Sequence, residues 1–171
     1  LPGLNKAPNT NATPKVELKA LSLFSGPTSK KDGLADHLKR LGWSNVYEYD
    51  NAVSSGGGWH LDLLNDGIYA DLLARAGRGE FAAIMVAFPC STFSIARFFD
   101  GARRFINGAW RAITGGDRGP QPVRTLEHPD GLPVGELDPR HRKELLRTNR
   151  LLDRAVAICV AGRNSSANTT V

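Results

Sequence analysis

The sequence predicts an α/β domain in which helices cover both faces of a doubly wound, mostly parallel sheet. Two observations carry this prediction. Short apolar, β-forming segments alternate with segments of helical periodicity, and the most apolar segment, residues 81–88, stops abruptly at Pro89. The chain has 171 residues, of which 41% are hydrophobic, which suits one domain around one core. Its longest apolar runs are far too short for a membrane span.

The first half of the chain is expected to form two strands joined by a helix. Residues 16–24 are rich in apolar and β-forming side chains and predict a buried strand that meets a Ser-Gly-Pro turn. Leu34, Leu38 and Leu41 then recur at helical spacing before a glycine stop. Residues 45–49 are typical of a second, shorter strand.

The second half is expected to form a helix, a central strand and a long final helix. Residues 59–62 resemble the end of a strand, residues 68–76 have helical periodicity, and residues 91–137 are Gly- and Arg-rich and predict an irregular segment. Asp138 and the proline after it should cap a helix that runs to about residue 161. Its apolar face is expected to comprise Leu145, Leu146, Leu152, Val156 and Cys159.

Composition limits the remaining possibilities. Residues 1–15 and 164–171 are polar and predict a flexible arm and tail around a domain at 16–163. The formal charge of +5 is compatible with a nucleic-acid partner. Two cysteines predict a reducing, intracellular location, nuclear or cytoplasmic, and the histidines lack metal-ligand spacing, so no metal is expected.

Residues suited to a nucleoside ligand follow the predicted strands. Ligands of such sheets bind beyond the carboxyl ends of the strands. For a nucleoside, small residues there would let the backbone approach the ligand, carboxylates would accept hydrogen bonds from the ribose hydroxyls, and an aromatic ring would stack on the purine. The residues at these ends are Phe24, Ser25, Gly26, Glu48, Tyr49, Asp50, Asp62, Pro89 and Cys90.

Taken in order, these segments resemble the S-adenosylmethionine-dependent cytosine-5 DNA methyltransferases. Residues 88–94 match the Pro-Cys-x-x-Phe-Ser loop of that family, and residues 23–26 with Gly33 and Leu34 resemble its cofactor loop and helix. The resemblance covers roughly residues 18–95; residues 119–133 are more loosely similar to methylase-like proteins of mobile elements. It implies a Rossmann-like fold that binds S-adenosylmethionine through Phe24, Ser25, Gly26, Glu48, Tyr49, Asp62 and Pro89.

The resemblance also implies a mechanism. The thiolate of Cys90 would add to C6 of a flipped cytosine, and the resulting enamine would take the methyl group at C5. The DNA, or alternatively an RNA, would be contacted by Ser91, Arg97, Arg103, Arg104 and Arg124.

The chain departs from the family in two places, and these keep a second interpretation open. The loop over residues 26–33 is longer than the usual glycine-rich turn and holds two lysines, and the Glu-Asn-Val segment of the family has no match, so the methyltransferase domain is expected to be incomplete. The alternative is a catalytically inactive, methyltransferase-like module that binds nucleic acid or serves as a scaffold. Cys90 would then be a structural thiol, and Glu48 and Asp62 solvated strand-end charges.

Overall fold

The structure, a computed structural model, has a parallel sheet of three strands at its centre. The residues described are 17–26, 32–53, 57–88, 90–93, 103–106, 109–112 and 122–167. The strands are β1 (Lys19–Leu23), β2 (Asn45–Tyr49) and β3 (Ala83–Val86), in the order β2-β1-β3. Leu21 of β1 pairs with Tyr47 on one side and Ile84 on the other, so β1 is the central strand.

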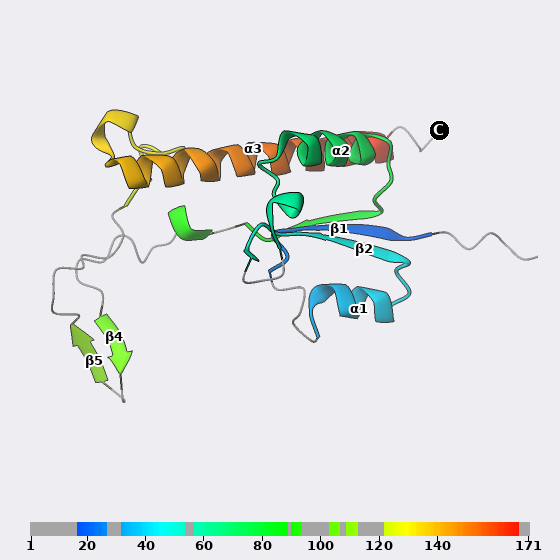
Figure 1. Cartoon of the computed structure of the whole chain (residues 1–171), viewed down its shortest axis with the longest axis horizontal. Coiled ribbons are helices and arrows are strands. Elements are labelled where there is room, and N and C mark those ends of the chain that lie inside the picture. The colour runs from blue at the N-terminus through cyan, green and yellow to red at the C-terminus, as the bar shows by residue number, and fades with distance from the viewer. Residues whose placement is uncertain are drawn as a thin grey trace, which may run out of the picture.

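Helices cover both faces of this sheet. α1 (Leu34–Arg40) connects β1 to β2, and α2 (Asp66–Gly77) connects β2 to β3. Because β2 and β3 lie on opposite sides of β1, two right-handed crossovers must place their helices on opposite faces. In Figure 1, α1 lies below the sheet, and α2 and α3 (Pro139–Ala167) lie above it. The predicted α/β class, with a parallel sheet between helices, is confirmed.

The main core lies between the sheet and the pair α2 and α3. Leu21 and Leu23 point from β1 toward this face and are at most 1% exposed. They pack with residues of both helices that are equally enclosed, Leu72, Ala155 and Ile158. α3 also packs closely against β3 at Gly162. A side chain at this position would place its Cβ atom only 2.6 Å from the Ile84 side chain, so only glycine fits without a shift.

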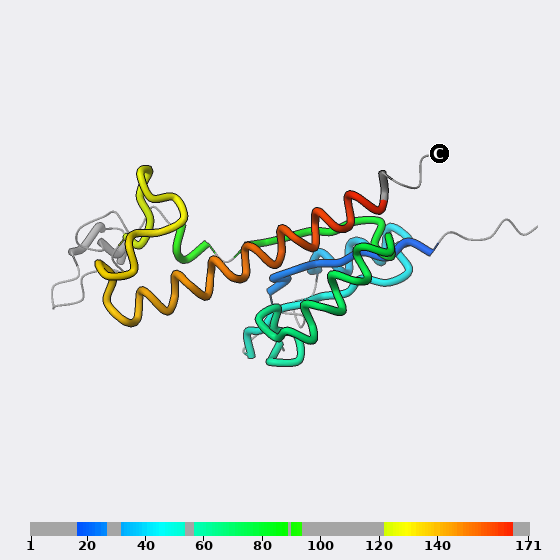
Figure 2. Tube along the Cα trace, turned by 90° about the horizontal axis from the view of Figure 1, so that it is seen from above, coloured from blue at the N-terminus to red at the C-terminus, as the bar shows by residue number. Residues whose placement is uncertain are grey.

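The N-terminal half of α3 extends beyond the carboxyl ends of the strands. Figure 2 shows this helix running past the sheet toward the segment before it, drawn in yellow. There Val123, Leu137 and Leu145 form a second, smaller buried cluster, against which Leu132 packs. The segment at 122–137 thus anchors the part of α3 that the sheet does not reach.

Two predictions about helices were wrong. On α3, Leu146 and Val156 are 53% and 50% exposed, while the side chains that pack are those of Leu145, Leu151, Ala155 and Ile158. The long helix carries apolar residues on more than one stripe, and periodicity cannot tell which stripe meets a partner. α3 also continues to Ala167, so residues 164–167 do not belong to a flexible tail.

Two predictions about strands were also wrong. Residues 59–61 form a 3₁₀ turn, η2 (Trp59–Leu61), in which the N–H of Leu61 donates to the carbonyl of Gly58 at 2.9 Å. Within the segment expected to be irregular, β4 (Arg103–Ile106) and β5 (Ala109–Ala112) form an antiparallel pair. Each of these elements is only three or four residues long, too short for a periodic pattern to identify.

The corrected face of α3 leads to a stability prediction. Leu151→Ala should lower the free energy of unfolding by about 2 to 4 kcal/mol, because it leaves a cavity against the main core. Leu146→Ala makes the same chemical change at an exposed position of the same helix and should cost less than about 1 kcal/mol. Urea denaturation followed by circular dichroism would measure both. Equal losses would mean that the face is assigned incorrectly.

Candidate functional site

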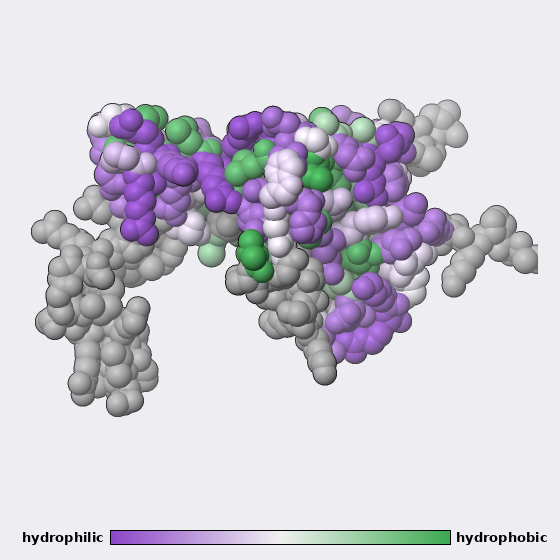
Figure 3. All heavy atoms as spheres, in the orientation of Figure 1, coloured by the Kyte–Doolittle hydropathy of each residue, from purple (hydrophilic) through white to green (hydrophobic). Residues whose placement is uncertain are grey.

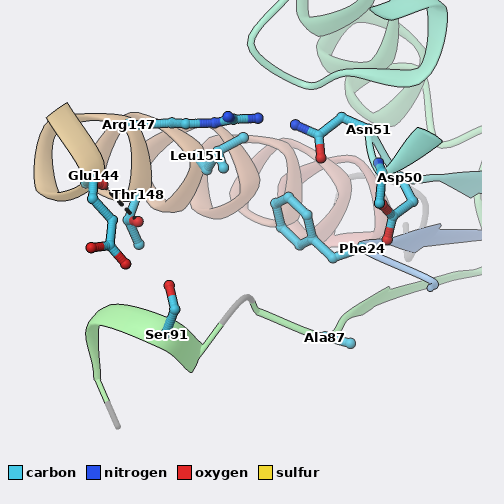
Figure 4. Close-up of a pocket in the computed structure, with 10 residues that line it drawn as sticks. Phe24, Asp50, Asn51, Ala87, Ser91, Glu144, Arg147, Thr148 and Leu151 are labelled. Carbon is cyan, nitrogen blue, oxygen red and sulfur yellow. Dashed lines mark hydrogen bonds between the residues drawn. The ribbon is translucent and has the colours of Figure 1, made fainter. Parts of the chain in front are cut away.

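A pocket of about 440 Å³ lies at the carboxyl end of the sheet. Three separate parts of the chain enclose it: the turns after the strands, the 3₁₀ turn η3 (Cys90–Thr92) and the N-terminal half of α3. Figure 4 shows the strand ends on one side, η3 below and α3 above. The chain crosses from β1 to β2 on one side and then from β2 back past β1 to β3 on the other, and open α/β sheets bind ligands beyond the carboxyl ends of the strands where the order reverses in this way. The lining residues are Phe24, Asp50, Asn51, Ala52, Ala87, Ser91, Glu144, Arg147, Thr148 and Leu151.

The turn after β1 has an unusual backbone. Phe24 has a φ of 60°, a left-handed conformation that is uncommon for a bulky residue, and its N–H donates to the Tyr49 carbonyl at 2.7 Å. Its ring lies 5.5 Å from that of Phe88, centroid to centroid. Gly26 follows with a φ of 75°, which glycine adopts without steric cost. The structure therefore places Phe24 at the pocket, and Ser25, whose Oγ is buried with no hydrogen-bond partner in the described chain, next to it.

The carboxylate of Asp50 joins the turns after β1 and β2. Its Oδ2 accepts the N–H of Gly26 at 2.9 Å, and its Oδ1 accepts the N–H of Ala52 at 2.7 Å. A carboxylate has about four lone-pair sites, so about two remain for a ligand. Asp50 is thus the acidic strand-end residue that faces the pocket.

Glu48 and Tyr49, which were expected to bind the cofactor, do not line this pocket. Tyr49 packs against the main core on the α2 side of the sheet. Burial raises the pKa of its phenol, and the nearby charge of Arg75 acts in the opposite direction. Side chains alternate along a strand, so Glu48 lies on the opposite face, toward α1. Their expected contacts with a ligand remain predictions.

Asp62 lies in a neighbouring groove. Its Oδ1 accepts the N–H of Leu64 at 2.9 Å, and its Oδ2 is 3.9 Å from a guanidinium nitrogen of Arg147. Arg147 lines both this groove and the pocket, and in Figure 4 it extends across the pocket toward Asn51. One arginine of α3 therefore connects the two sites.

Cys90, the expected nucleophile, is the first residue of η3 and is not among the residues that line the pocket. Its side chain is exposed, and its carbonyl accepts the N–H of Phe93 at 3.0 Å. The next residue, Ser91, lines the pocket, whereas Pro89 lies outside the described residues. The second cysteine, Cys159, is half-buried in α3, where burial raises the pKa of its thiol.

Arg124, which was expected to contact nucleic acid, is instead an internal residue with an exposure of 6%. Its guanidinium donates to Thr92 Oγ1 at 3.4 Å, to the Pro129 carbonyl at 2.7 Å and to Asn149 Oδ1. It also lies 4.0 Å from the centre of the Phe93 ring, and burial lowers its pKa. These three bonds use most of its five N–H donors inside the protein, and its expected contact with nucleic acid remains a prediction. Arg124 positions η3 against α3.

Of the other residues expected to contact nucleic acid, Ser91 lines the pocket, and the side chains of the remaining arginines lie outside the described part of the chain. Arg97 lies outside the described residues, and Arg103 and Arg104 belong to β4, of which only the backbone is described. Their predicted roles stay predictions.

Sequence reasoning missed the wall of the pocket that α3 provides. Glu144, Arg147, Thr148 and Leu151 follow one another at spacings of three, one and three residues, which places them on one side of a helix. That spacing was visible in the sequence. Nothing in it indicated that α3 would pass over the carboxyl end of the sheet.

Comparisons with protein-family models, with curated proteins and with solved structures found no match to this chain. No helix in the described ranges is long and apolar enough to cross a membrane. Among those same residues, no three or more His, Cys, Asp or Glu side chains gather as a metal site would require.

The internal role of Arg124 can be tested by mutation. Arg124→Leu should lower the free energy of unfolding by about 2 to 4 kcal/mol, because it leaves the oxygens of Pro129 and Asn149 without their donor. Arg140→Leu, at an exposed position of α3, should change it by less than about 0.5 kcal/mol. Thermal and urea unfolding would measure both. If the two variants were equally stable, the Arg124 bonds would contribute little to the fold.

Proposed function

We propose that the chain is a Rossmann-like methyltransferase domain that transfers a methyl group from S-adenosylmethionine to C5 of cytosine in DNA. The observation that carries this proposal is the pocket at the carboxyl end of the sheet, which is lined by Phe24 and by Ser91, the residue that follows Cys90 in the chain. These are the residues on which the resemblance to cytosine-5 methyltransferases rests. A DNA substrate would place the activity inside the cell, in the nucleus or cytoplasm.

The pocket residues fit S-adenosylmethionine in size and chemistry. A volume of about 440 Å³ lies within the usual range of small-molecule sites. The remaining lone pairs of Asp50 suit ribose hydroxyls, and the ring of Phe24 offers an apolar surface to a base. The guanidinium of Arg147 and the carboxylate of Glu144 are complementary to the carboxylate and ammonium groups of an amino acid.

Cys90 would act as the nucleophile. When bound, S-adenosylmethionine would supply an electrophilic methyl group. The exposed thiol of Cys90 is accessible to a base that has left its helix, and the Arg124 bonds to Thr92 and Asn149 would hold η3 in place during the reaction. Ser91 would then face the ligand from the same turn.

One observation favours the second candidate, an inactive methyltransferase-like module. Tyr49, the aromatic residue expected to stack on adenine, packs into the core near Arg75. In a domain that does not bind S-adenosylmethionine, the Tyr49 ring would have no ligand to stack on and could pack in the core instead. Binding of S-adenosylmethionine therefore separates the two candidates.

Ala87→Phe should abolish binding of S-adenosylmethionine, because its ring would fill the pocket. Ala87 is exposed and its backbone pairs with Leu23, so the fold should tolerate the change. Ala82→Phe is the matched control: Ala82 is also exposed and backbone-paired, but it lies at the other end of β3. Isothermal titration calorimetry would measure both variants. No binding by the unaltered chain would favour the inactive module, and equal binding by both variants would place the ligand elsewhere.

Cys90→Ser should abolish a covalent complex with a DNA duplex that contains 5-fluorocytosine. The assay contains S-adenosylmethionine, which gives its methyl group to C5 and leaves as S-adenosylhomocysteine. Release of the thiolate then requires loss of the C5 proton, and fluorine in its place blocks this elimination, so the adduct at C6 persists and is visible by denaturing electrophoresis. Cys159→Ser should retain the complex, because that thiol is half-buried and its pKa is raised. If the unaltered chain bound S-adenosylmethionine but formed no adduct, Cys90 would not be a nucleophile.

A further inference from the structure

A groove of about 650 Å³ runs beside the N-terminal half of α3. Asp62 and Leu64 contribute to its lining from the segment before α2, and α3 supplies the rest. We call it the basic groove, and its cationic residues are Arg142, Lys143, Arg147 and Arg150. Figure 3 shows a predominantly hydrophilic surface over this end of the molecule.

The positive charge of the basic groove is only partly neutralised. Arg150 forms an ion pair with Asp66 at 2.9 Å, and Arg147 lies 3.9 Å from Asp62. In the described part of the chain, neither Arg142 nor Lys143 has a carboxylate within 4.0 Å, and the buried Nε of Arg142 has no hydrogen-bond partner. Four cations and two carboxylates leave an excess of about two positive charges.

The position of these cations on the helix is unfavourable for stability alone. The N-terminus of a helix carries the positive end of the helix dipole, where acidic residues stabilise and basic residues do not. Asp138 caps this terminus, where its Oδ1 accepts the N–H groups of Arg140 and His141 at 2.9 Å, but the first turn itself has no acidic residue, and Arg142 and Lys143 follow within the next residues. An anion bound in the groove would offset the side-chain charges that remain beside this capped terminus.

We propose that the basic groove binds the phosphate backbone of a nucleic acid. Lys143, Arg147 and Arg150 follow one side of α3 over about 10 Å, since the helix rises about 1.5 Å per residue. Such a row suits a polyanion better than a single small anion, and guanidinium groups match phosphate geometry.

A nucleic acid fits the groove better than an acidic peptide does. Of the described residues that line it, none is aromatic. Protein interfaces favour aromatic anchors and contain few lysines, whereas phosphate contacts need only cations. The proposal rests on the charges of α3 and does not require methyl transfer.

The test compares two variants with the same change in charge. Lys143→Gln/Arg150→Gln removes two cations from the basic groove, and Lys39→Gln/Arg40→Gln removes two from α1, on the opposite face of the sheet. Fluorescence anisotropy would measure binding to a labelled duplex of A·T pairs only, without S-adenosylmethionine, between 50 and 200 mM salt. This duplex has no cytosine, so the result is independent of the proposed reaction. Circular dichroism and urea unfolding would show that both variants fold.

The groove variant should bind about tenfold more weakly at low salt, and the slope of log K against log salt should fall by about 1.8. The α1 variant should bind nearly as tightly as the unaltered chain. Equal losses in both variants would show that net charge alone drives binding and would overturn the proposal. The proposal would also be overturned if the unaltered chain did not bind the duplex. It would be overturned as well if the chain bound a poly-glutamate peptide through the basic groove as tightly as it binds the duplex.

Discussion

The bonds of the Arg124 guanidinium hold the candidate site together. Thr92 belongs to η3, Pro129 to the segment before α3 and Asn149 to α3, and all three accept from this one side chain. Arginine suits this role because its planar group offers five donors in fixed directions. The residue that the sequence associated with DNA therefore acts inside the protein.

Asp50 plays the corresponding role on the opposite wall. One carboxylate accepts N–H groups from the turns after β1 and β2 and so joins the two strand ends. The strained backbone of Phe24 is held by its bond to the Tyr49 carbonyl and by its contact with Phe88. The pocket thus lies between two walls, one organised by a carboxylate and the other by a guanidinium.

α3 serves several purposes because different sides of it meet different surroundings. Ala155 and Ile158 complete the main core, Leu145 completes the smaller cluster, and Thr148 lines the pocket. Arg154 connects α3 to α2, donating to the Leu63 carbonyl at 2.8 Å and to Asp66, whose pKa this bond lowers. A helix of 29 residues is long enough to pack on the sheet at one end and extend past it at the other. The side of α3 that carries Lys143, Arg147 and Arg150 lines the basic groove.

Local signals in the sequence were enough to identify the three strands of the parallel sheet, the three helices, and the turns after the strands in which Phe24, Asp50 and Ser91 lie. Apolar runs, helical spacing and turn residues act over a few positions, so they can be recognised without knowledge of the fold. The packed side of α3, the burial of Arg124 and the core position of Tyr49 could not be recognised in this way. Each depends on contacts between residues far apart in the chain, as between Arg124 and Thr92, and these exist only once the helices have packed against the sheet.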